Sequence, residues 1–317
     1  MVDVSIVIVC MNNLGNLYPC LTSINEQTEG VNYETLVVAY LFSKENLKKV
    51  QEDFPWVQFI ESNEIRGFSE NNNLALRQAK GKYCFILNDD TYFDENVVGT
   101  LVKSFKFDDD VAILSPLTLN KDGSIQRCGK PKYNIGTYIL GLLGLLKLYE
   151  NHSVYTNKHS IFRTYNISGA AFLIRKDIFE KVGWFDERYF FCPEDIALST
   201  ILNKNGYKCY VNADTKLTHA VGGSWSKVIV ATKPATVRGL VIFYRDESLL
   251  SMLLYRLIAS FEYSFKTIYW MIKNLFKVNE HNITMKKANW HGLMALYSSK
   301  TPKQLFTYYY KQLKKNK

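Results

Sequence analysis

Two neighbouring carboxylates stand where an apolar run ends in the first third of the chain: Asn88, Asp89 and Asp90 directly follow residues 83–87. Burying an unpaired charge is very costly, so these side chains are expected to project from a buried strand into a crevice. Mg²⁺ and Mn²⁺ bind one or two protein carboxylates and complete their shell with phosphate oxygens and water. A metal held in this way neutralises a leaving diphosphate. By itself the motif also fits an Asp-rich turn that caps a helix beginning at Asp94, so both interpretations stay open.

A second acidic pair opens a predicted helix further along the chain, where Glu194 and Asp195 follow Pro193 and the aromatic residues 189–191. Proline and acidic residues in a first turn are ordinary helix-initiating signals. The same carboxylates are suited to act as a general base that removes a proton from an acceptor hydroxyl. The neighbouring aromatic rings would hold a sugar ring and partly desolvate the acid. Asp195, with Glu194 beside it, is therefore a candidate for catalysis.

A histidine and two runs of small residues complete the candidate set. His219 precedes the glycine-rich residues 220–224, whose backbone N–H groups suit phosphate contact, and its imidazole is a possible metal ligand. A lone histidine is more often structural. Residues 169–171 are Gly-Ala-Ala, and small side chains of this kind allow either a close ligand or tight packing.

Hydrophobic periodicity indicates the elements that must position these groups. Strands are predicted at residues 4–10, 34–39, 57–60, 83–87, 111–114, 167–175 and 208–212, and helices at 17–24, 47–54, 69–79 (with Ser69 as N-cap), 97–105 and 195–205. This alternation predicts an α/β fold with a mostly parallel, doubly wound sheet, which binds ligands beyond the carboxyl ends of its strands. Only Gly15 stands in the first strand–helix turn, so the three-glycine fingerprint of an NAD enzyme is missing.

The C-terminal quarter has a different texture. Residues 233–317 hold all of the excess in the net charge of +9, and residues 249–276 are rich in large apolar side chains interrupted by charges such as Lys266 and Lys273. A membrane-spanning helix is destabilised by such charges, whereas an amphipathic helix in the membrane interface tolerates them. A helix packed on the rest of the chain is the alternative. The apolar residues 138–146 make about half a membrane span, and belong either to the core or to the same interface.

Partners and compartment follow from the same composition. The aromatic residues of the C-terminal quarter lie in Leu- and Ile-rich helical stretches, which favours lipid over nucleic acid as a partner. The six cysteines form no CxxC pair, which favours a reduced compartment and argues against a zinc cluster. No secretory signal and no uninterrupted apolar run of about 18 residues is evident. We therefore expect a cytoplasmic protein bound peripherally to the inner face of a membrane.

The order of these motifs resembles family 2 glycosyltransferases with the GT-A fold, especially their rhamnosyltransferase-like branch. The resemblance covers roughly residues 1–227. It is carried by residues 4–9, 66–73 and 87–91, by 168–171 followed by Glu194 and Asp195, and by His219 with Gly222 and Ser224. Each motif is loose alone, but their common order and spacing are specific.

The resemblance implies an inverting, metal-dependent transfer from a nucleotide-sugar donor, with dTDP-rhamnose as one such donor, to a lipid-linked or growing surface glycan. Asp90 would be the main ligand of Mn²⁺ or Mg²⁺, His219 would contact the metal or the diphosphate, and Asp195 would be the base. The donor would be bordered by Cys10, Asn12, Asn13, Tyr40, Arg66, Gly67, Asn71, Asn88 and Asp89. Residues 1–235 would form the catalytic domain, and residues 236–317 a basic, aromatic-rich helical extension at the membrane.

One departure from the family pattern concerns the nucleotide. Family members usually carry an acidic residue just after the second strand, whereas residues 39–43 here are Ala-Tyr-Leu-Phe-Ser. Either Tyr40 stacks on the base or nucleotide recognition is altered. A non-catalytic GT-A-like subunit of a glycan-assembly complex is the alternative function, but the presence of both Asp90 and Asp195 favours an enzyme.

Overall fold

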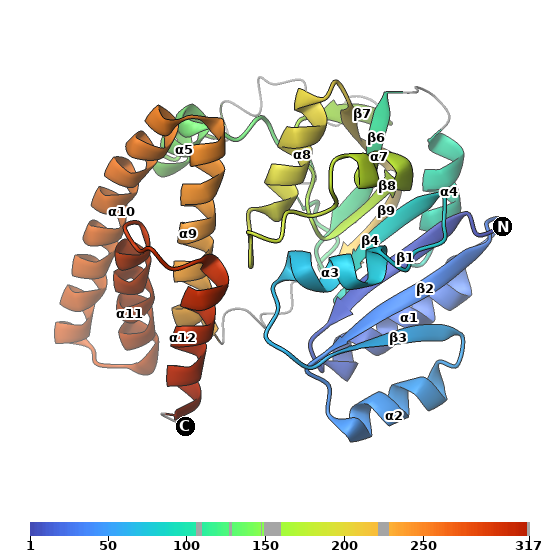
Figure 1. The fold of residues 1–317 in the computed structure, drawn as a ribbon, viewed down its shortest axis with the longest axis horizontal. Helices are drawn as coiled ribbons and strands as arrows, with labels where there is room; N and C mark the ends of the chain where they lie inside the picture. Colours follow the sequence, from blue (N-terminus) through green and yellow to red (C-terminus); the bar gives the residue numbers. More distant parts are fainter. Residues whose placement is uncertain (106–109, 127–128, 147, 149–159, 221–227, 316–317) are drawn as a thin grey trace.

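The computed structural model describes residues 1–105, 110–126, 129–146, 148, 160–220 and 228–315. Figure 1 shows two parts side by side, a mixed α/β layer built on one twisted sheet and a group of helices from the C-terminal part of the chain. The predicted fold class, a mostly parallel sheet followed by a helical extension, is confirmed.

The first half of the sheet alternates strands with helices. Its elements are β1 (Val4–Cys10), α1 (Leu14–Gln27), β2 (Tyr33–Tyr40), α2 (Lys44–Asp53), β3 (Val57–Ser62), α3 (Phe68–Leu76) and β4 (Tyr83–Asn88). The strands pair in parallel in the order β3-β2-β1-β4. Their carboxyl ends therefore meet at one edge, which is where such sheets bind ligands.

The second half of the sheet is mixed. The strands of this half and the helices between them are, in chain order, β5 (Thr91–Tyr92), α4 (Val97–Ser104), β6 (Val111–Leu119), α5 (Ile135–Leu142), β7 (Ile161–Thr164), β8 (Ala171–Arg175), α7 (Lys176–Lys181), α8 (Glu194–Lys204) and β9 (Lys208–His219). The strand β8 lies antiparallel between β4 and β6, and β9 runs parallel to β6. The short strand β5 pairs antiparallel with the end of β9. This last pairing links the segment after β4 to the last residues of β9.

The sheet is buried on both faces, as its continuous apolar runs predict. In β1, Ile6 and Ile8 pack with Leu21 of α1 on one face, and Val7 packs with Leu76 of α3 on the other. All of these side chains are fully buried. The sheet is thus a rigid base for the residues that follow its strands.

Some boundaries differ from the sequence prediction, among them the start of α3 and the end of β9. Helix α3 begins at Phe68 rather than Ser69, because Gly67 is its N-cap. Helix α4 begins at Val97, as predicted from the helical spacing and not at Asp94, and its N-cap Asn96 accepts a hydrogen bond from the amide of Gly99 at 2.9 Å. The caps of these helices therefore lie away from the Asp89–Asp90 pair. Strand β9 runs on to His219, well past its expected end.

The helical part consists of α9 (Ile229–Glu247), α10 (Leu249–Phe276), α11 (Glu280–Ala295) and α12 (Pro302–Lys315). Helix α9 packs against each of the other three. Its core includes Tyr244 stacked on Tyr255, with ring centroids 4.7 Å apart. The expected domain boundary between residues 235 and 236 lies inside α9, so the helical part is continuous with the segment that approaches the sheet.

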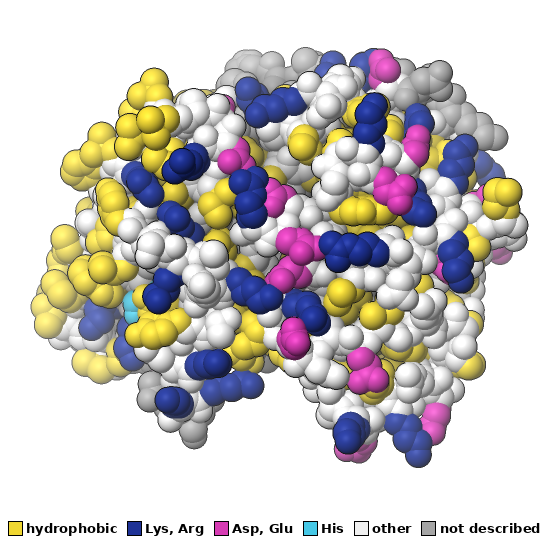
Figure 2. Space-filling model, in the orientation of Figure 1, with side chains coloured by type: hydrophobic (Ala, Val, Ile, Leu, Met, Phe, Trp, Pro, Cys, Tyr) yellow, Lys and Arg dark blue, Asp and Glu magenta, His cyan; other side chains and the backbone are white. Residues whose placement is uncertain are grey.

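Helix α10 carries apolar side chains on both of its faces. Met252, Tyr255 and Ala259 are buried against the other helices, while large apolar residues on the opposite face are exposed. Figure 2 shows hydrophobic side chains gathered along the edge of the molecule formed by this helix. Among the described residues, no helix has both the length and the apolar character needed to cross a membrane.

Candidate active site

The pairing of β5 with β9 brings the first acidic pair and the histidine together. Thr91 lies opposite His219 in this ladder, and the amide of Ala220 donates a hydrogen bond to the backbone oxygen of Asp90 at 2.8 Å. As a result Nε2 of His219 lies 3.2 Å from Oδ1 of Asp90. The two predicted metal ligands are therefore adjacent, at the carboxyl edge of the sheet.

The side chain of Gln126 determines how His219 faces Asp90. The Nε2 amide of Gln126 donates to the backbone oxygen of His219 at 2.8 Å, so its Oε1 faces Nδ1 of the ring at 3.0 Å. Because Oε1 can only accept, Nδ1 carries the proton in the neutral ring and Nε2 presents a lone pair. The Nδ2 amide of Asn88, 3.5 Å from Nε2, agrees with this assignment.

This geometry fits a divalent cation. In the neutral tautomer the Nε2 lone pair faces a carboxylate oxygen of Asp90, and a cation between the two atoms would be bound by both. Among the described residues, no three His, Cys, Asp or Glu side chains converge as a ready-made metal cluster. Mg²⁺ and Mn²⁺ do not need one, because phosphate oxygens and water complete their shell.

The neighbouring Asp89 has a raised pKa. Burial raises its pKa to about 6, hydrogen bonds from Cys10 and Asn16 oppose this rise, and the charge of Asp90 adds to it. Cys10 itself is fully buried, and burial raises the pKa of its thiol far above the usual value. Cys10 is therefore a neutral hydrogen-bond donor to the carboxylate of Asp89.

The second acidic pair lies at the start of α8. The carboxylate of Asp195 accepts hydrogen bonds from the amide of Gly169 at 3.2 Å and from the amide of Ile196 at 2.8 Å. A Cβ at Gly169 would lie 3.5 Å from Cβ of Asp195, an ordinary van der Waals distance, so Gly169 and Asp195 are in direct contact without the contact requiring glycine. The next residue, Ala170, accepts a hydrogen bond from the amide of Asn88 at 2.9 Å. One short segment thus connects the two acidic pairs.

Glu194 lies in a strained turn. Its carboxylate accepts a hydrogen bond from the amide of Cys192, whose φ of +57° is unusual for a residue with a side chain. Burial, and then the charge of Asp195, raise the pKa of Glu194 above its usual value. A carboxyl group that is protonated near neutrality can donate a hydrogen bond as well as accept one.

Helix α9 packs against this turn, a contact that was not predicted from the sequence. The hydroxyl of Thr236 donates to the backbone oxygen of Phe191 at 3.0 Å. A Cβ at Gly239 would lie only 2.9 Å from the backbone oxygen of Cys192. The helix therefore approaches the turn before α8 as closely as backbone atoms allow, and helps to position both acids.

A cavity of about 180 Å³ adjoins Asp89. Its wall contains the predicted donor residues Asn13, Tyr40, Arg66, Gly67, Asn71 and Asp89, with Met11 from the same loop as Asn13. It also contains Phe190 and Phe191, two of the aromatic residues predicted to hold a sugar ring, and residues not predicted from sequence: Val9, Phe68, Val228, Thr232 and Phe306. The cavity combines the ends of three parallel strands with Val228 and Thr232 at the start of α9 and Phe306 of α12. It is the place that the sequence predicted for a nucleotide.

The remaining predicted residues lie beside this cavity rather than in its wall. Asn12, with φ of +50°, accepts hydrogen bonds from the amide of Ser43 at 3.2 Å and from the side chain of Asn46 at 2.9 Å. It therefore joins the turn after β1 to the start of α2. Gly222 and Ser224 lie outside the described residues.

The loop before α3 depends on a close backbone contact. A Cβ at Gly67 would lie 2.3 Å from the backbone oxygen of Phe190, which explains the glycine. The amide of Arg66 donates to the hydroxyl of Tyr40 at 3.3 Å. Only 7% of Tyr40 is exposed, which leaves little ring surface for stacking on a base. The residue after β2, Leu41, has a φ of +52° and offers no carboxylate.

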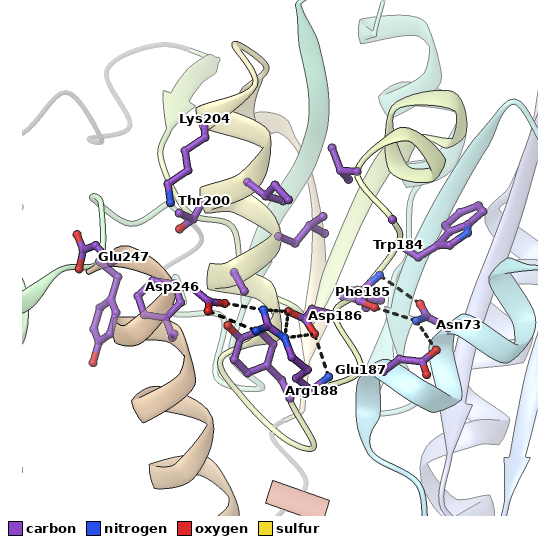
Figure 3. Close-up of a pocket in the computed structure, with 18 of the residues that line it drawn as sticks. Asn73, Trp184, Phe185, Asp186, Glu187, Arg188, Thr200, Lys204, Asp246 and Glu247 are labelled. Carbon is purple, nitrogen blue, oxygen red and sulfur yellow. Dashed lines mark hydrogen bonds and ion pairs between the residues drawn. The ribbon is translucent and has the colours of Figure 1, made fainter. Parts of the chain in front are cut away.

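A larger cavity of about 490 Å³ lies between α8, α9 and the segment 182–189, and of the residues predicted to act in the site its wall contains only Tyr189. Figure 3 shows Arg188 directed at both Asp186 and Asp246, at 2.6 and 2.5 Å. The side-chain amide of Asn73 donates a hydrogen bond to the backbone oxygen of Phe185 at 2.9 Å. These contacts anchor the segment that leads into the second acidic pair.

The mostly parallel sheet, the acids at its carboxyl edge and the antiparallel insertion of β8 define a glycosyltransferase of the GT-A type. The chain belongs to the family described as Glycosyl transferase family 2, whose sequence model matches residues 5–183, more than half of the chain. The enzyme class predicted from the sequence is the class of this family.

Individual relatives are more distant. The O-antigen biosynthesis protein RfbC of Myxococcus xanthus is 27% identical over 161 residues, which cover 47% of this chain and 12% of that protein. The chain thus matches only a small part of that longer relative.

Solved structures share the fold. They include GalNAc-T7 with UDP, GalNAc and Mn²⁺, at 17% identity and a TM-score of 0.55, covering 69% of this chain and 44% of that one. They also include the mannosyltransferase PcManGT from Pyrobaculum calidifontis in complex with GDP-Man and Mn²⁺, at 16% identity and a TM-score of 0.53, covering 93% and 85%. At these identities the likeness establishes the fold alone.

Proposed function

We propose that this protein is an inverting, metal-dependent glycosyltransferase that moves a sugar from a nucleoside-diphosphate donor to a hydroxyl of a lipid-linked or growing surface glycan. The observation that carries the proposal is the connection between the two acidic pairs. The amide of Asn88 donates a hydrogen bond to the backbone oxygen of Ala170, and the amide of Gly169 donates one to the carboxylate of Asp195. A diphosphate site and a base at opposite ends of one short segment suit an in-line displacement.

In this reaction Asp195 is the base. Its hydrogen bonds to Gly169 and Ile196 hold the carboxylate in one orientation. The acceptor oxygen attacks the anomeric carbon, its proton passes to Asp195, and the bond from that carbon to the diphosphate oxygen breaks. Attack from the face opposite the leaving group inverts the anomeric centre. Glu194, backed by α9, maintains the turn from which Asp195 projects.

Asp90 and His219 would hold Mn²⁺ or Mg²⁺, and the ion when bound would neutralise charge on the leaving diphosphate. Gln126 keeps Nε2 of His219 directed at that position. Asp89 lies in the wall of the cavity, where it meets the donor.

The relatives support the choice of substrates. Two proteins of similar fold were solved with UDP or GDP-mannose together with Mn²⁺, and one relative in sequence takes part in O-antigen biosynthesis. We propose a nucleotide sugar, with dTDP-rhamnose among the donors to be tested, and a surface glycan as the product.

The exposed face of α10 supports a place for the enzyme at a membrane. Large apolar residues spaced three and four positions apart follow this face along all 28 residues of the helix: Leu250, Leu254, Leu257, Phe261, Phe265, Ile268, Ile272 and Leu275. Phe265 and Leu275 are 72% and 79% exposed. At about 1.5 Å per residue the stripe from Leu250 to Leu275 is about 38 Å long, which is more exposed apolar surface than an isolated soluble protein usually carries.

We propose that this stripe lies in the interface of an anionic membrane on the cytoplasmic side. Lys266 and Lys273 lie on one side of the stripe, where Lys266 pairs with Glu262 at 2.5 Å and Lys273 packs over the rings of Tyr269 and Trp270. Basic flanks beside an apolar face are typical of helices that bind anionic lipid surfaces. A second copy of the chain on the same face is the competing outcome.

The function is tested by calorimetric titration of the purified protein with UDP, GDP, dTDP and their sugar conjugates, each with and without Mn²⁺. We expect one nucleotide to bind and Mn²⁺ to increase its affinity, and the matching sugar to be transferred to a lipid-linked acceptor. A folded protein that binds none of them would instead support the non-catalytic subunit. The lack of an acidic residue after β2 would then explain why no nucleotide binds.

A further inference from the structure

The C-terminal helix α12 contacts the catalytic part of the chain directly. Nζ of Lys303 lies 2.7 Å from Oε1 of Glu70 in α3. The ring of Phe306 stacks on Phe190, with centroids 4.3 Å apart and an angle of 29° between the planes. The ring of Tyr310 stacks in turn on Phe306 at 5.2 Å. Figure 1 shows α12 alongside α9, on the side that faces α3.

The contact between Lys303 and Glu70 extends to the wall of the donor cavity. While Oε1 of Glu70 meets the lysine, its Oε2 accepts a hydrogen bond from the amide of Gly67 at 3.0 Å. Gly67 and its neighbour Arg66 both line the cavity of about 180 Å³. Lys303 therefore orients Glu70, and Glu70 holds the loop that forms one side of the cavity.

Phe306 lines the same cavity directly, with no other residue between its ring and the cavity. It lies in the cavity wall together with Phe190, Phe191 and Asp89, although only 6% of its own surface is exposed. Its other partners are the small residues Ala231 and Ala235 of α9. A ring fixed in this way by neighbouring rings and a helix surface presents a rigid apolar contact at low entropic cost.

We propose that α12 completes the donor pocket, with Phe306 as a binding residue for the nucleoside diphosphate and Lys303 as a positioning residue that acts through Glu70. The inference rests on the proposed function, because it assigns the cavity to the donor. It makes the helical extension part of the active site, so donor affinity depends on a helix that lies outside the part of the chain matched by the family.

The test of Phe306 is the affinity of Phe306→Leu and Phe306→Ala for the nucleoside diphosphate that binds the wild type, measured by calorimetry with Mn²⁺. Tyr308→Ala is the control, since Tyr308 is a half-exposed aromatic residue on the same helix that does not line the cavity. We expect Phe306→Leu, which keeps an apolar side chain and the fold, to weaken binding about fivefold or more. Tyr308→Ala should bind as the wild type does.

The test of Lys303 separates positioning from packing. Lys303→Gln should weaken nucleotide binding about threefold or more and raise KM with little change in kcat. Lys303→Arg should restore the wild-type affinity and KM. Lys311→Gln, which removes an exposed positive charge from the same helix, should have no effect.

The outcomes are distinguishable. Wild-type affinity in folded Phe306→Leu and in Lys303→Gln would overturn the role of α12 and leave the proposed function standing. Absence of nucleotide binding by the wild type itself would overturn the proposed function, and this inference with it.

Discussion

Nε2 of His219 lies 3.2 Å from Oδ1 of Asp90, and Gln126 determines which of the two ring nitrogens faces that carboxylate. No spacing in the sequence marks Gln126, because it comes from the turn after β6 and meets His219 only in the folded chain. The three residues form a carboxylate, an imidazole and the partner that orients the imidazole, as is usual around metal-binding histidines.

Gln126→Leu should lower the affinity for Mn²⁺ about tenfold or more, because the ring of His219 loses the partner that directs Nε2 toward Asp90. The measurement is the Mn²⁺ concentration that gives half-maximal nucleotide binding. Gln58→Leu is a matched control, since Gln58 pairs with Gln78 far from the site. Equal Mn²⁺ dependence of the two variants would show that Gln126 has no part in metal binding.

Asp195→Asn should lower kcat by about 10²–10⁴-fold, the usual loss when a general base is removed. Its affinity for the nucleoside diphosphate should stay within about twofold of the wild type, because Asp195 does not line the donor cavity. Parallel calorimetry and transfer assays decide the point, with the exposed Asp214→Asn as the control. Substantial turnover by Asp195→Asn would assign the base to another residue.

Glu194→Gln should make the protein less sensitive to rising pH. Burial and the charge of Asp195 raise the pKa of Glu194 in the folded state above its usual value of 4.5, so the folded protein holds a proton that the unfolded chain releases. Stability from this group is therefore present at low pH and declines as pH rises above about 4.5. Glutamine keeps the acceptor for the amide of Cys192 and has no proton to lose.

Thermal unfolding of both proteins across pH 5 to 9 measures this difference. The melting temperature of Glu194→Gln relative to the wild type should increase with pH through that range. A difference that stays constant, or that shrinks as pH rises, would contradict the raised pKa.

Phe261→Ser combined with Phe265→Ser should reduce sedimentation with vesicles of anionic lipid by about tenfold or more, because two of the most exposed rings leave the interface. Tyr308→Ser removes an exposed ring from α12 and should have little effect. Light scattering in the absence of lipid tests the alternative occupant of the stripe. A wild-type dimer that the double substitution converts to a monomer would assign the stripe to a second copy of the chain.

Some features of the site could be predicted because they depend on neighbouring residues. The apolar run before Asn88 and the Pro-Glu-Asp start of α8 both define where a carboxylate leaves a secondary structure element, and the positions of Asp90 and Asp195 follow from that. Gly67 was indicated only by the family resemblance, and its physical reason, the backbone of Phe190 within reach of a Cβ, is a tertiary contact. The roles of Gln126, Thr236 and Phe306 were not identifiable, since each acts on residues distant in the chain.

The amino-acid sequence by itself determined the alternation of strands and helices, the acids at the ends of β4 and the start of α8, and the long apolar helix α10, because these depend on periodicity and local caps. Only the tertiary structure decided that β5 pairs with β9, that β8 runs antiparallel between β4 and β6, and that α9 and α12 close around the acidic site. The physical reason is that strand pairing and helix docking are set by which buried surfaces fit together. That choice is made by the whole core at once, and no single segment encodes it.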